Sequence, residues 1–231
     1  LNIPVMHDDQ HGTAIVVLAS IINALKVVRK RKESVQVVIN GAGAAGIAIT
    51  KLLHYYGVEN IVICDSQGVI NKKRKNLISV KKEILKITNK QNVSGSLSDA
   101  LKDADIFIGV SKGNVLKSSD IKAMAEKAIV FAMANPIPEI MPADAKRAGA
   151  AIVASGRSDF PNQINNVLVY PGIFKGAIES RTSKITEKMK VAAAEALADV
   201  VSKPTAGKII PDIFDKKVVL AVSNAVKKLA S

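Results

Sequence analysis

Asparagine amides gathered on glycine- and proline-rich segments indicate a site for a small polar ligand. The segment Gln163-Ile164-Asn165-Asn166 lies shortly before Val169-Tyr170-Pro171-Gly172 and downstream of Ala134-Asn135-Pro136. An amide side chain both donates and accepts hydrogen bonds, which suits recognition of such a ligand. For Asn135 alone, an ordinary role as a turn-forming residue before proline is an equal alternative.

A glycine-rich loop precedes these amides and predicts a dinucleotide site. The apolar run Val35 to Asn40 leads into Gly41-Ala42-Gly43-Ala44-Ala45-Gly46, which opens a helix-forming segment. This spacing permits a tight turn, close approach of a pyrophosphate, and close helix packing, with unpaired N–H donors at the helix start. Asp65, 19 residues after Gly46, is placed to accept hydrogen bonds from the adenosine ribose. The predicted cofactor-binding residues are Gly41, Gly43, Ala44, Ala45, Gly46 and Asp65. The alternative is a glycine-rich turn in an α/β fold that binds no nucleotide.

The residues around Asp65 bear on the choice of dinucleotide. A carboxylate at this position repels a 2′-phosphate and favours NAD, whereas Lys72, Lys73 and Arg74 follow soon after and are compatible with NADP. We therefore expect NAD or NADP, with a preference for NAD.

The segment His7-Asp8-Asp9-Gln10-His11-Gly12-Thr13 places adjacent carboxylates before an apolar helix. Carboxylates are ligands for hard divalent cations such as Mg²⁺ or Mn²⁺, although aspartates also cap helices. His7 and His11 have the spacing of a zinc pair but lack a third ligand. His54 is expected to be a structural or surface residue.

Composition indicates a globular protein. The 231 residues are 48% hydrophobic and carry a net charge of +13, with dense basic stretches at 26–32 and 72–82. Aromatic residues make up only 3%, too few for base stacking, so we expect no nucleic-acid partner. The longest apolar run, 14–25, is shorter than the ~20 residues of a membrane span. The single cysteine, Cys64, is expected to be buried, which fits a reducing cytoplasm.

Alternating strand and helix patterns must position these motifs. Strands are predicted at 35–40, 60–64, 105–110, 128–132 and 151–154. Helices are predicted at 12–30, 44–56, 73–89, 118–126, 142–148, 184–201 and 216–229, with a loop-rich segment after Gly156 and a connector at 204–211. This rhythm predicts an α/β fold: a doubly wound, mostly parallel, Rossmann-like sheet with flanking N- and C-terminal helices.

The motifs together resemble the NAD(P)-binding domain of malic enzymes, and more closely the small bacterial or archaeal form. The likeness runs in order across nearly the whole chain. It is carried by residues 4–14, the Gly41–Gly46 loop, Asp65-Ser66-Gln67-Gly68, residues 134–139, Ser155-Gly156-Arg157-Ser158-Asp159, residues 162–166 and Ile209-Ile210-Pro211.

This resemblance implies oxidative decarboxylation of L-malate to pyruvate and CO₂, with reduction of NAD(P) and a requirement for Mg²⁺ or Mn²⁺. It assigns Asp9 as a metal ligand and Asp8 as a catalytic residue that organises the lysine region. It further implies that Asn135 and Asn166 bind malate and that Asn165 lies near the nicotinamide. Family likeness also implies a homodimer.

The family's amino-terminal domain, which supplies a tyrosine acid, a lysine base and two more acidic metal ligands, has no match here. We expect residues 1–231 to form one NAD(P)-binding domain with a helical C-terminal extension, part of a longer protein because Leu1 is not a start methionine. Alone, it is expected to bind dinucleotide but turn over malate poorly. The principal alternative is a non-catalytic dinucleotide-sensing module; an amino-acid dehydrogenase fits the Asp8-Asp9 pair less well.

Overall fold

A six-stranded sheet forms the centre of the protein in the computed structural model, which describes residues 3–230. Its order is β3-β2-β1-β4-β5-β6, and only the short β3 is antiparallel. The strands are β1 (Gln36–Asn40), β2 (Asn60–Asp65), β3 (Gly68–Val69), β4 (Ile106–Gly109), β5 (Ile129–Ala132) and β6 (Ile152–Ser155). The predicted doubly wound, mostly parallel sheet is confirmed.

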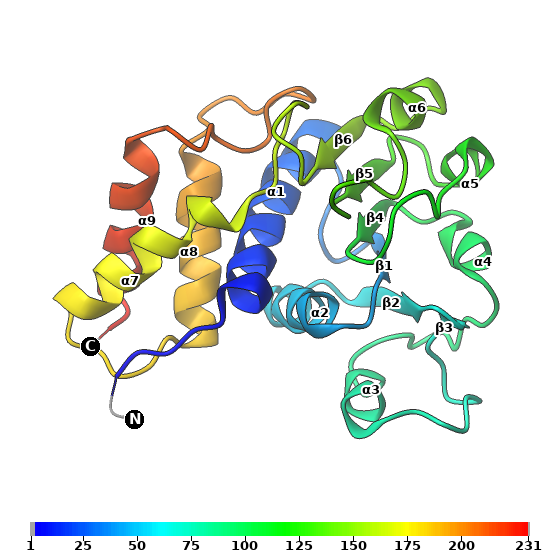
Figure 1. Ribbon diagram of the computed structural model, residues 1–231, viewed down its shortest axis with the longest axis horizontal. Coiled ribbons are helices and arrows are strands. Elements are labelled where there is room, and N and C mark those ends of the chain that lie inside the picture. Colours follow the sequence, from blue (N-terminus) through cyan, green and yellow to red (C-terminus); the bar gives the residue numbers. More distant parts are fainter. Residues whose placement is uncertain (1–2, 231) are drawn as a thin grey trace.

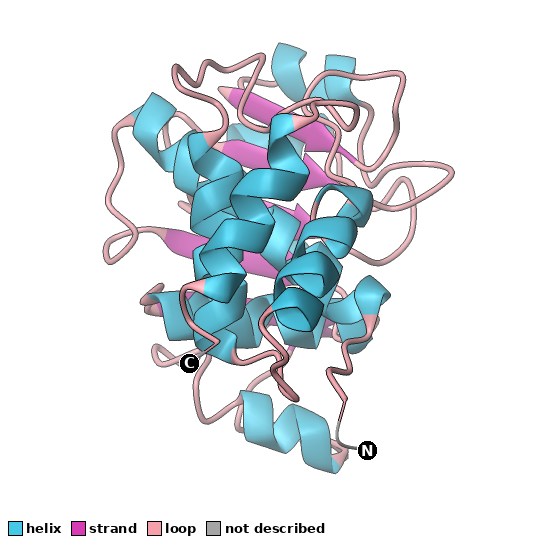
Figure 2. Ribbon diagram, turned by 90° about the vertical axis from the view of Figure 1, so that its left-hand side faces the viewer, coloured by secondary structure: helices cyan, strands magenta, loops and turns pink. Residues whose placement is uncertain are grey.

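Helices cover both faces of this sheet (Figure 1). One side carries α1 (Thr13–Val28) and α2 (Ala44–Tyr56), with α7 (Tyr170–Glu179), α8 (Glu187–Asp199) and α9 (Lys217–Lys227) packed outside them. The other side carries α4 (Leu97–Leu101), α5 (Ser118–Lys122) and α6 (Pro142–Arg147), while α3 (Ser79–Ile84) lies beyond the β3 edge. Figure 2 shows the outer helices stacked in front of the strands.

The alternating direction of side chains along each strand divides the buried residues between the two faces of the sheet. Val37 and Ile39 of β1 belong to the larger core under α1 and α2, whereas Val38 belongs to the smaller core under α4 to α6. Side chains of a strand point alternately to opposite faces, so a continuous apolar strand needs cover on both. Each fully buried Ile or Phe contributes about 1.5–3 kcal/mol through removal from water.

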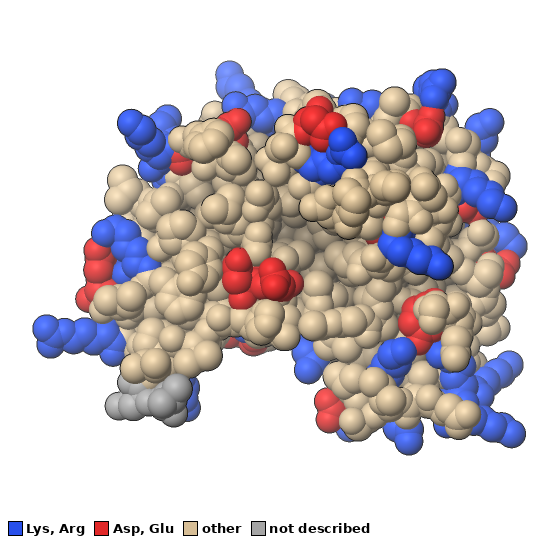
Figure 3. All heavy atoms as spheres, in the orientation of Figure 1, with Lys and Arg blue, Asp and Glu red and all other residues tan. Residues whose placement is uncertain are grey.

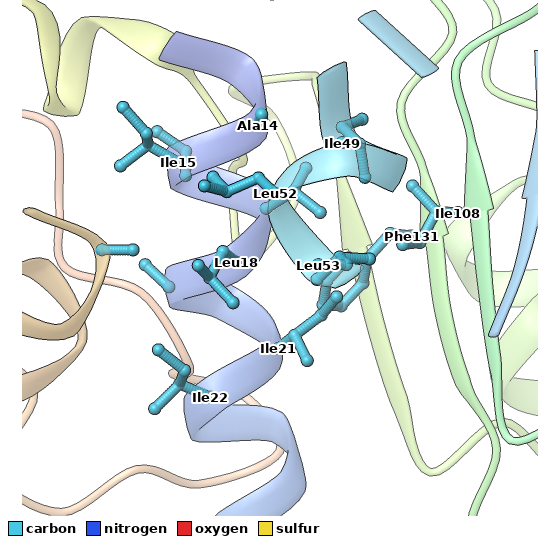
Figure 4. Close-up of a cluster of buried hydrophobic side chains, with 14 of the residues drawn as sticks. Ala14, Ile15, Leu18, Ile21, Ile22, Ile49, Leu52, Leu53, Ile108 and Phe131 are labelled. Atoms are coloured by element: carbon cyan, nitrogen blue, oxygen red, sulfur yellow. The ribbon is translucent and has the colours of Figure 1, made fainter. Parts of the chain in front are cut away.

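Helix α1 is a core element because it is apolar on nearly every side. Ile15, Leu18 and Ile21 are fully buried. Figure 4 shows Ile21 on the side of α1 that faces α2, near Leu53, whereas Ile15 points away from α2. With the preceding π-helical turn η1 (Asp8–Gly12), the helix reaches 21 residues, long enough to cross a membrane by length and composition. The length argument made from sequence was therefore wrong; the burial of most of these residues inside the protein is what marks a core helix.

Buried asparagines attach the C-terminal helices to the sheet domain. The Asn23 amide on α1 donates to the carbonyls of Ala198 (2.8 Å) and Ile209 (3.0 Å). Asn162 donates to the carbonyls of Val153 and Ala206 and accepts from the Ile209 amide at 2.9 Å. The connector 204–211 is thus fixed by hydrogen bonds to distant backbone.

Several predicted elements differ from the structure. The segment after Gly156, predicted as loop, contains the 3₁₀ turn η2 (Asn166–Leu168) and α7, in which Pro171 occupies the first turn. A proline fits there because the first helical N–H groups have no intrahelical partner. The long basic helix predicted at 73–89 is reduced to α3, and β3 and α4 were not predicted.

Candidate functional site

The glycine loop connects β1 to α2 at the centre of the sheet, where chain order reverses between β1 and β4. Gly41 has φ +124°, which L side chains rarely adopt, and a Cβ there would lie 2.6 Å from the Val110 carbonyl oxygen. A Cβ on Gly46 would lie 1.7 Å from the Gly41 carbonyl oxygen. A Cβ on Gly43 would meet nothing within 4 Å, so this glycine leaves open space above the start of α2.

A cleft of about 860 Å³ lies over this loop. Crevices outside the carboxyl ends of parallel strands, at a switch in strand order, are where such sheets bind ligands. The cleft is lined by Asn40, Gly41, Ala42, Gly43, Asp65, Ser66, Gln67, Gly68, Lys81, Gly95, Ser96, Leu97, Ser111, Lys112 and Val115. Of the predicted cofactor-binding residues, Gly41, Gly43 and Asp65 line it, whereas Ala44, Ala45 and Gly46 form the first turn of α2.

Asp65 is engaged by two cations. Arg74 donates to its two carboxylate oxygens over 2.9 and 3.1 Å, and the Lys81 ammonium donates over 2.6 Å. Burial alone would raise the pKa of Asp65, but hydrogen bonds from Arg74 and Lys81 lower it to about 2. The sequence placed Arg74 near this site but did not indicate Lys81. One carboxylate between two cations leaves the Asp65 end of the cleft with a net positive charge.

A second cavity of about 430 Å³ adjoins the first, and Ser111 lines both. It is lined by Asp9, Thr13, Val110, Ser111, Met133, Ala134, Asn135, Gly156, Ile164, Asn165 and Asn166. The fold therefore brings four predicted site residues, Asp9, Asn135, Asn165 and Asn166, into one polar cavity. Figure 3 shows one face of the protein, with acidic atoms beside a hollow near the middle of the view and most Lys and Arg around its outline.

Asp8 lies behind this cavity rather than among its lining residues. Its Oδ2 accepts a hydrogen bond from the Asn166 amide at 2.5 Å, while its Oδ1 is buried without a partner among the described residues. Gly12 makes this packing possible, because a Cβ there would lie 2.3 Å from that Oδ1. Burial, and secondarily repulsion from Asp9, raises the pKa of Asp8.

The acidic turn fits one part of a divalent-cation site. Asp9 places a carboxylate in a cavity with three asparagine amides, and oxygen donors are what Mg²⁺ and Mn²⁺ prefer. Within residues 3–230, however, no three His, Cys, Asp or Glu side chains come together as a metal cluster.

Two buried charged residues had no role predicted from sequence, although Glu139 is the last residue of the 134–139 motif. Glu139 is fully buried beneath the loops that follow β4 and β5. Lys190 on α8 is 5% exposed and donates to Nδ1 of His11 (3.1 Å) and to Glu187 (2.7 Å). Burial first, then the Lys190 charge, lowers the pKa of His11. Only the long-range packing of these residues reveals them.

Three other features noted from sequence, Cys64, the basic stretch 26–32 and His54, have surroundings typical of structural residues. Cys64 is buried as predicted, and burial raises the pKa of its thiol to about 12. In the basic stretch 26–32, Lys30 pairs with Asp105 at 2.5 Å and Lys32 donates to the Tyr56 carbonyl at 2.7 Å. His54 lies on α2, where its buried Nδ1 has no partner among the described residues.

Comparisons with known proteins agree over the whole chain. Residues 10–231 match the family model described as malic enzyme, NAD binding domain. The chain is 56% identical to the bifunctional malic/malolactic enzyme of Bacillus subtilis, covering 99% of this chain and 57% of the relative. It is 51% identical to the NAD-dependent malic enzyme of Geobacillus stearothermophilus, covering 100% of this chain and 48% of the relative. Against the NADP-dependent malic enzyme of Haemophilus influenzae the identity is 44%, with 100% of this chain and 33% of the relative covered.

Solved structures give the same result. The NAD-dependent malic enzyme of Thermotoga maritima superposes with a TM-score of 0.95 at 52% identity, covering 98% of this chain and 60% of that chain. The malic enzyme of Pyrococcus horikoshii superposes with a TM-score of 0.94 at 44% identity, covering 100% of this chain and 55% of that chain. This chain thus spans less than two thirds of the length of each of these relatives.

Proposed function

This chain belongs to the malic enzyme family, of which it is the NAD-binding domain, and from that premise we propose that it supplies the cofactor half of an enzyme that converts L-malate to pyruvate and CO₂ while reducing NAD or NADP. The observation that carries the proposal is the pair of adjoining cavities that share Ser111. One has the glycine loop expected for a dinucleotide, and the other gathers Asp9 and three asparagines. A hydride donor and acceptor must lie in contact, which adjoining cavities permit.

In this proposal the residues of the second cavity hold and orient the substrate. The amides of Asn135 and Asn166 bind malate, and Asn165 lies toward the nicotinamide ring. Asp9 is one ligand of Mg²⁺ or Mn²⁺, and such a cation, when bound, supplies positive charge that stabilises negative charge developing on substrate oxygen. Asp8, through its hydrogen bond to Asn166, connects the acidic turn to the substrate amides.

The acid–base groups must come from elsewhere in the protein. The second cavity is lined by neither tyrosine nor lysine, and Asp9 is the only carboxylate among its lining residues. We infer that a further domain closes over this cavity and provides them, since the full-length relatives are considerably longer. A homodimer and a cytoplasmic location remain predictions, as does the absence of a nucleic-acid partner.

Either dinucleotide is compatible with the site. The relatives include NAD-dependent and NADP-dependent enzymes. Asp65 at the proposed ribose end favours NAD, but the two positive charges of Arg74 and Lys81 exceed its single negative charge and weaken that preference. We therefore propose NAD as the preferred cofactor, with NADP accepted.

Production of NAD(P)H from L-malate and Mn²⁺ tests the proposal. The chain alone is compared with the same chain joined to a malic-enzyme amino-terminal domain, and with Asp9→Ala in the longer protein. Activity only in the longer protein, lost on Asp9→Ala, supports the proposed function. Dinucleotide binding without turnover in either form instead favours the non-catalytic sensing module.

A further inference from the structure

Glu139 is a buried carboxylate held between two loops of the site. It has no exposed surface, and among the described residues no lysine or arginine forms an ion pair with it. Its Oε1 accepts from the backbone N–H of Ser111 at 3.1 Å, and its Oε2 accepts from that of Ala134 at 3.0 Å. A single side chain thereby binds the loop that follows β4 and the loop that follows β5.

These two loops carry different parts of the proposed site. Ser111 lines both cavities, and Ala134 precedes the substrate-site residue Asn135. The Ser111 hydroxyl also accepts from the Asn40 amide at 2.8 Å, at the end of β1. A continuous series of hydrogen bonds, Asn40 to Ser111 to Glu139 to Ala134, therefore crosses three strand ends where both cavities open.

The surrounding backbone is shaped to hold the carboxylate in place. A Cβ on Gly109 would lie 2.3 Å from the carboxyl carbon of Glu139, so glycine there makes the space. The Glu139 carbonyl accepts from the Leu116 amide at 3.0 Å, which fixes its own backbone to the same loop. Burial raises the pKa of Glu139, although hydrogen bonds from the Ala134 and Ser111 amides oppose this. Burying an ionised carboxylate without a cationic partner costs free energy, so the hydrogen bonds of Glu139 to the two loops point to a positional role.

We propose that Glu139 is a positioning residue that fixes the distance between the Ser111 loop and the Asn135 loop, and thereby holds the nicotinamide end of the dinucleotide beside the substrate cavity. The inference rests on the proposed function. It concerns only the nicotinamide end, because the Asp65 region, proposed to hold the adenosine end, follows β2 and lies across β1 from the Ser111 loop.

The test compares NADH with ADP, which has the adenosine and diphosphate groups but no nicotinamide. Binding of both to the 231-residue chain is measured by calorimetry for wild type and Glu139→Gln. Glutamine has the same shape but offers one acceptor oxygen and turns an NH₂ toward the other loop. We expect NADH affinity to fall about tenfold, the effect of one lost buried hydrogen bond, with ADP affinity within about twofold of wild type.

Asp120→Asn is the matched control, since Asp120 is also a buried acid that accepts a backbone N–H, from Lys117 at 2.8 Å, but lines neither cavity. It should leave the ratio of NADH to ADP affinity unchanged. Gly109→Ala provides a second variant should Glu139→Gln not fold, because its methyl group displaces the same carboxylate.

An unchanged affinity ratio in Glu139→Gln or Gly109→Ala overturns the positional role. This includes an equal loss of NADH and ADP affinity, because that result indicates general destabilisation. A wild-type chain that binds neither ligand contradicts the proposed function itself, which distinguishes the two failures.

Discussion

The side-chain amide of Asn166 donates a hydrogen bond to the Asp8 carboxylate over 2.5 Å, joining residues 158 positions apart. Asp8 belongs to the π-helical turn that presents Asp9, and Asn166 begins the 3₁₀ turn that lines the same cavity. Single π-helical turns occur often at functional sites. The acidic turn and Asn166, a proposed substrate-binding residue, are therefore connected by one hydrogen bond to a carboxylate whose other oxygen has no partner among the described residues.

Replacing Asp8 by asparagine is expected to stabilise the fold at neutral pH. Because the pKa of Asp8 is raised above 3.8 in the folded protein, the folded state binds more protons than the unfolded state just above that pH. The free energy of unfolding therefore falls as pH rises through this window, and the ionised group remains unfavourable above it. Asp8→Asn removes the charge while keeping an oxygen for Asn166.

Thermal unfolding between pH 4 and 8 checks this. We expect the midpoint of Asp8→Asn to exceed that of wild type by on the order of 2 °C at pH 7, with a smaller gain at pH 4. Glu126→Gln, an equal charge change at an exposed residue, should show no such pH dependence. A lower midpoint for Asp8→Asn at every pH would mean that the Asp8 charge stabilises the acidic turn.

Alanine at two glycines of the dinucleotide loop should affect stability differently. Gly46→Ala places a methyl group 1.7 Å from the Gly41 carbonyl oxygen, so the loop must move. Such overpacking costs roughly 1–3 kcal/mol and should lower the unfolding midpoint and the NADH affinity together. Gly43→Ala meets no protein atom within 4 Å and should leave the midpoint unchanged.

Gly43→Ala should nevertheless weaken NADH binding roughly tenfold, because the methyl group enters the space left for the pyrophosphate. Calorimetry of NADH binding, combined with thermal unfolding, distinguishes Gly43→Ala from Gly46→Ala. Full NADH affinity in Gly43→Ala would show that the dinucleotide does not approach this glycine.

Removing the Lys81 ammonium should favour NAD over NADP. Lys81 and Arg74 both pair with Asp65, and without Lys81 the net charge of this group falls from +1 to zero. Loss of one charge-assisted hydrogen bond should lower NADPH affinity of Lys81→Met about tenfold relative to NADH. Lys86→Met, which changes a lysine outside the dinucleotide cleft, is the control. Equal loss of both dinucleotides would contradict a role in cofactor choice.

The pKa of His11 should rise when Lys190 is replaced by methionine. Burial and the Lys190 charge are the two largest causes that lower this pKa, so removing the Lys190 charge should raise it. With three histidines in the chain, an NMR titration of the imidazole C–H signals resolves the change. We expect His11 to titrate at higher pH in Lys190→Met than in wild type. An unchanged His11 pKa would show that Lys190 does not contact the ring in solution.

The short-range features of this protein were determined by sequence alone. The glycine loop, the apolar strands and Cys64 depend on neighbours within a few residues, so local pattern was sufficient to predict the sheet and the motif at its centre. The same local reasoning failed at α7. Gly172 and Gly176 were treated as loop residues, yet a Cβ on either would lie 2.7 Å from α9 atoms, so they permit close helix packing.

Only the tertiary structure decided how the site is connected. The pairing of Asp8 with Asn166, the contact of Lys81 with Asp65, and the two loops bound by Glu139 join residues far apart in the chain. Sequence shows which of these side chains can carry charge or hydrogen bonds. Which partner each one meets depends on the order and register of the parallel strands, whose carboxyl ends bring distant loops to one edge.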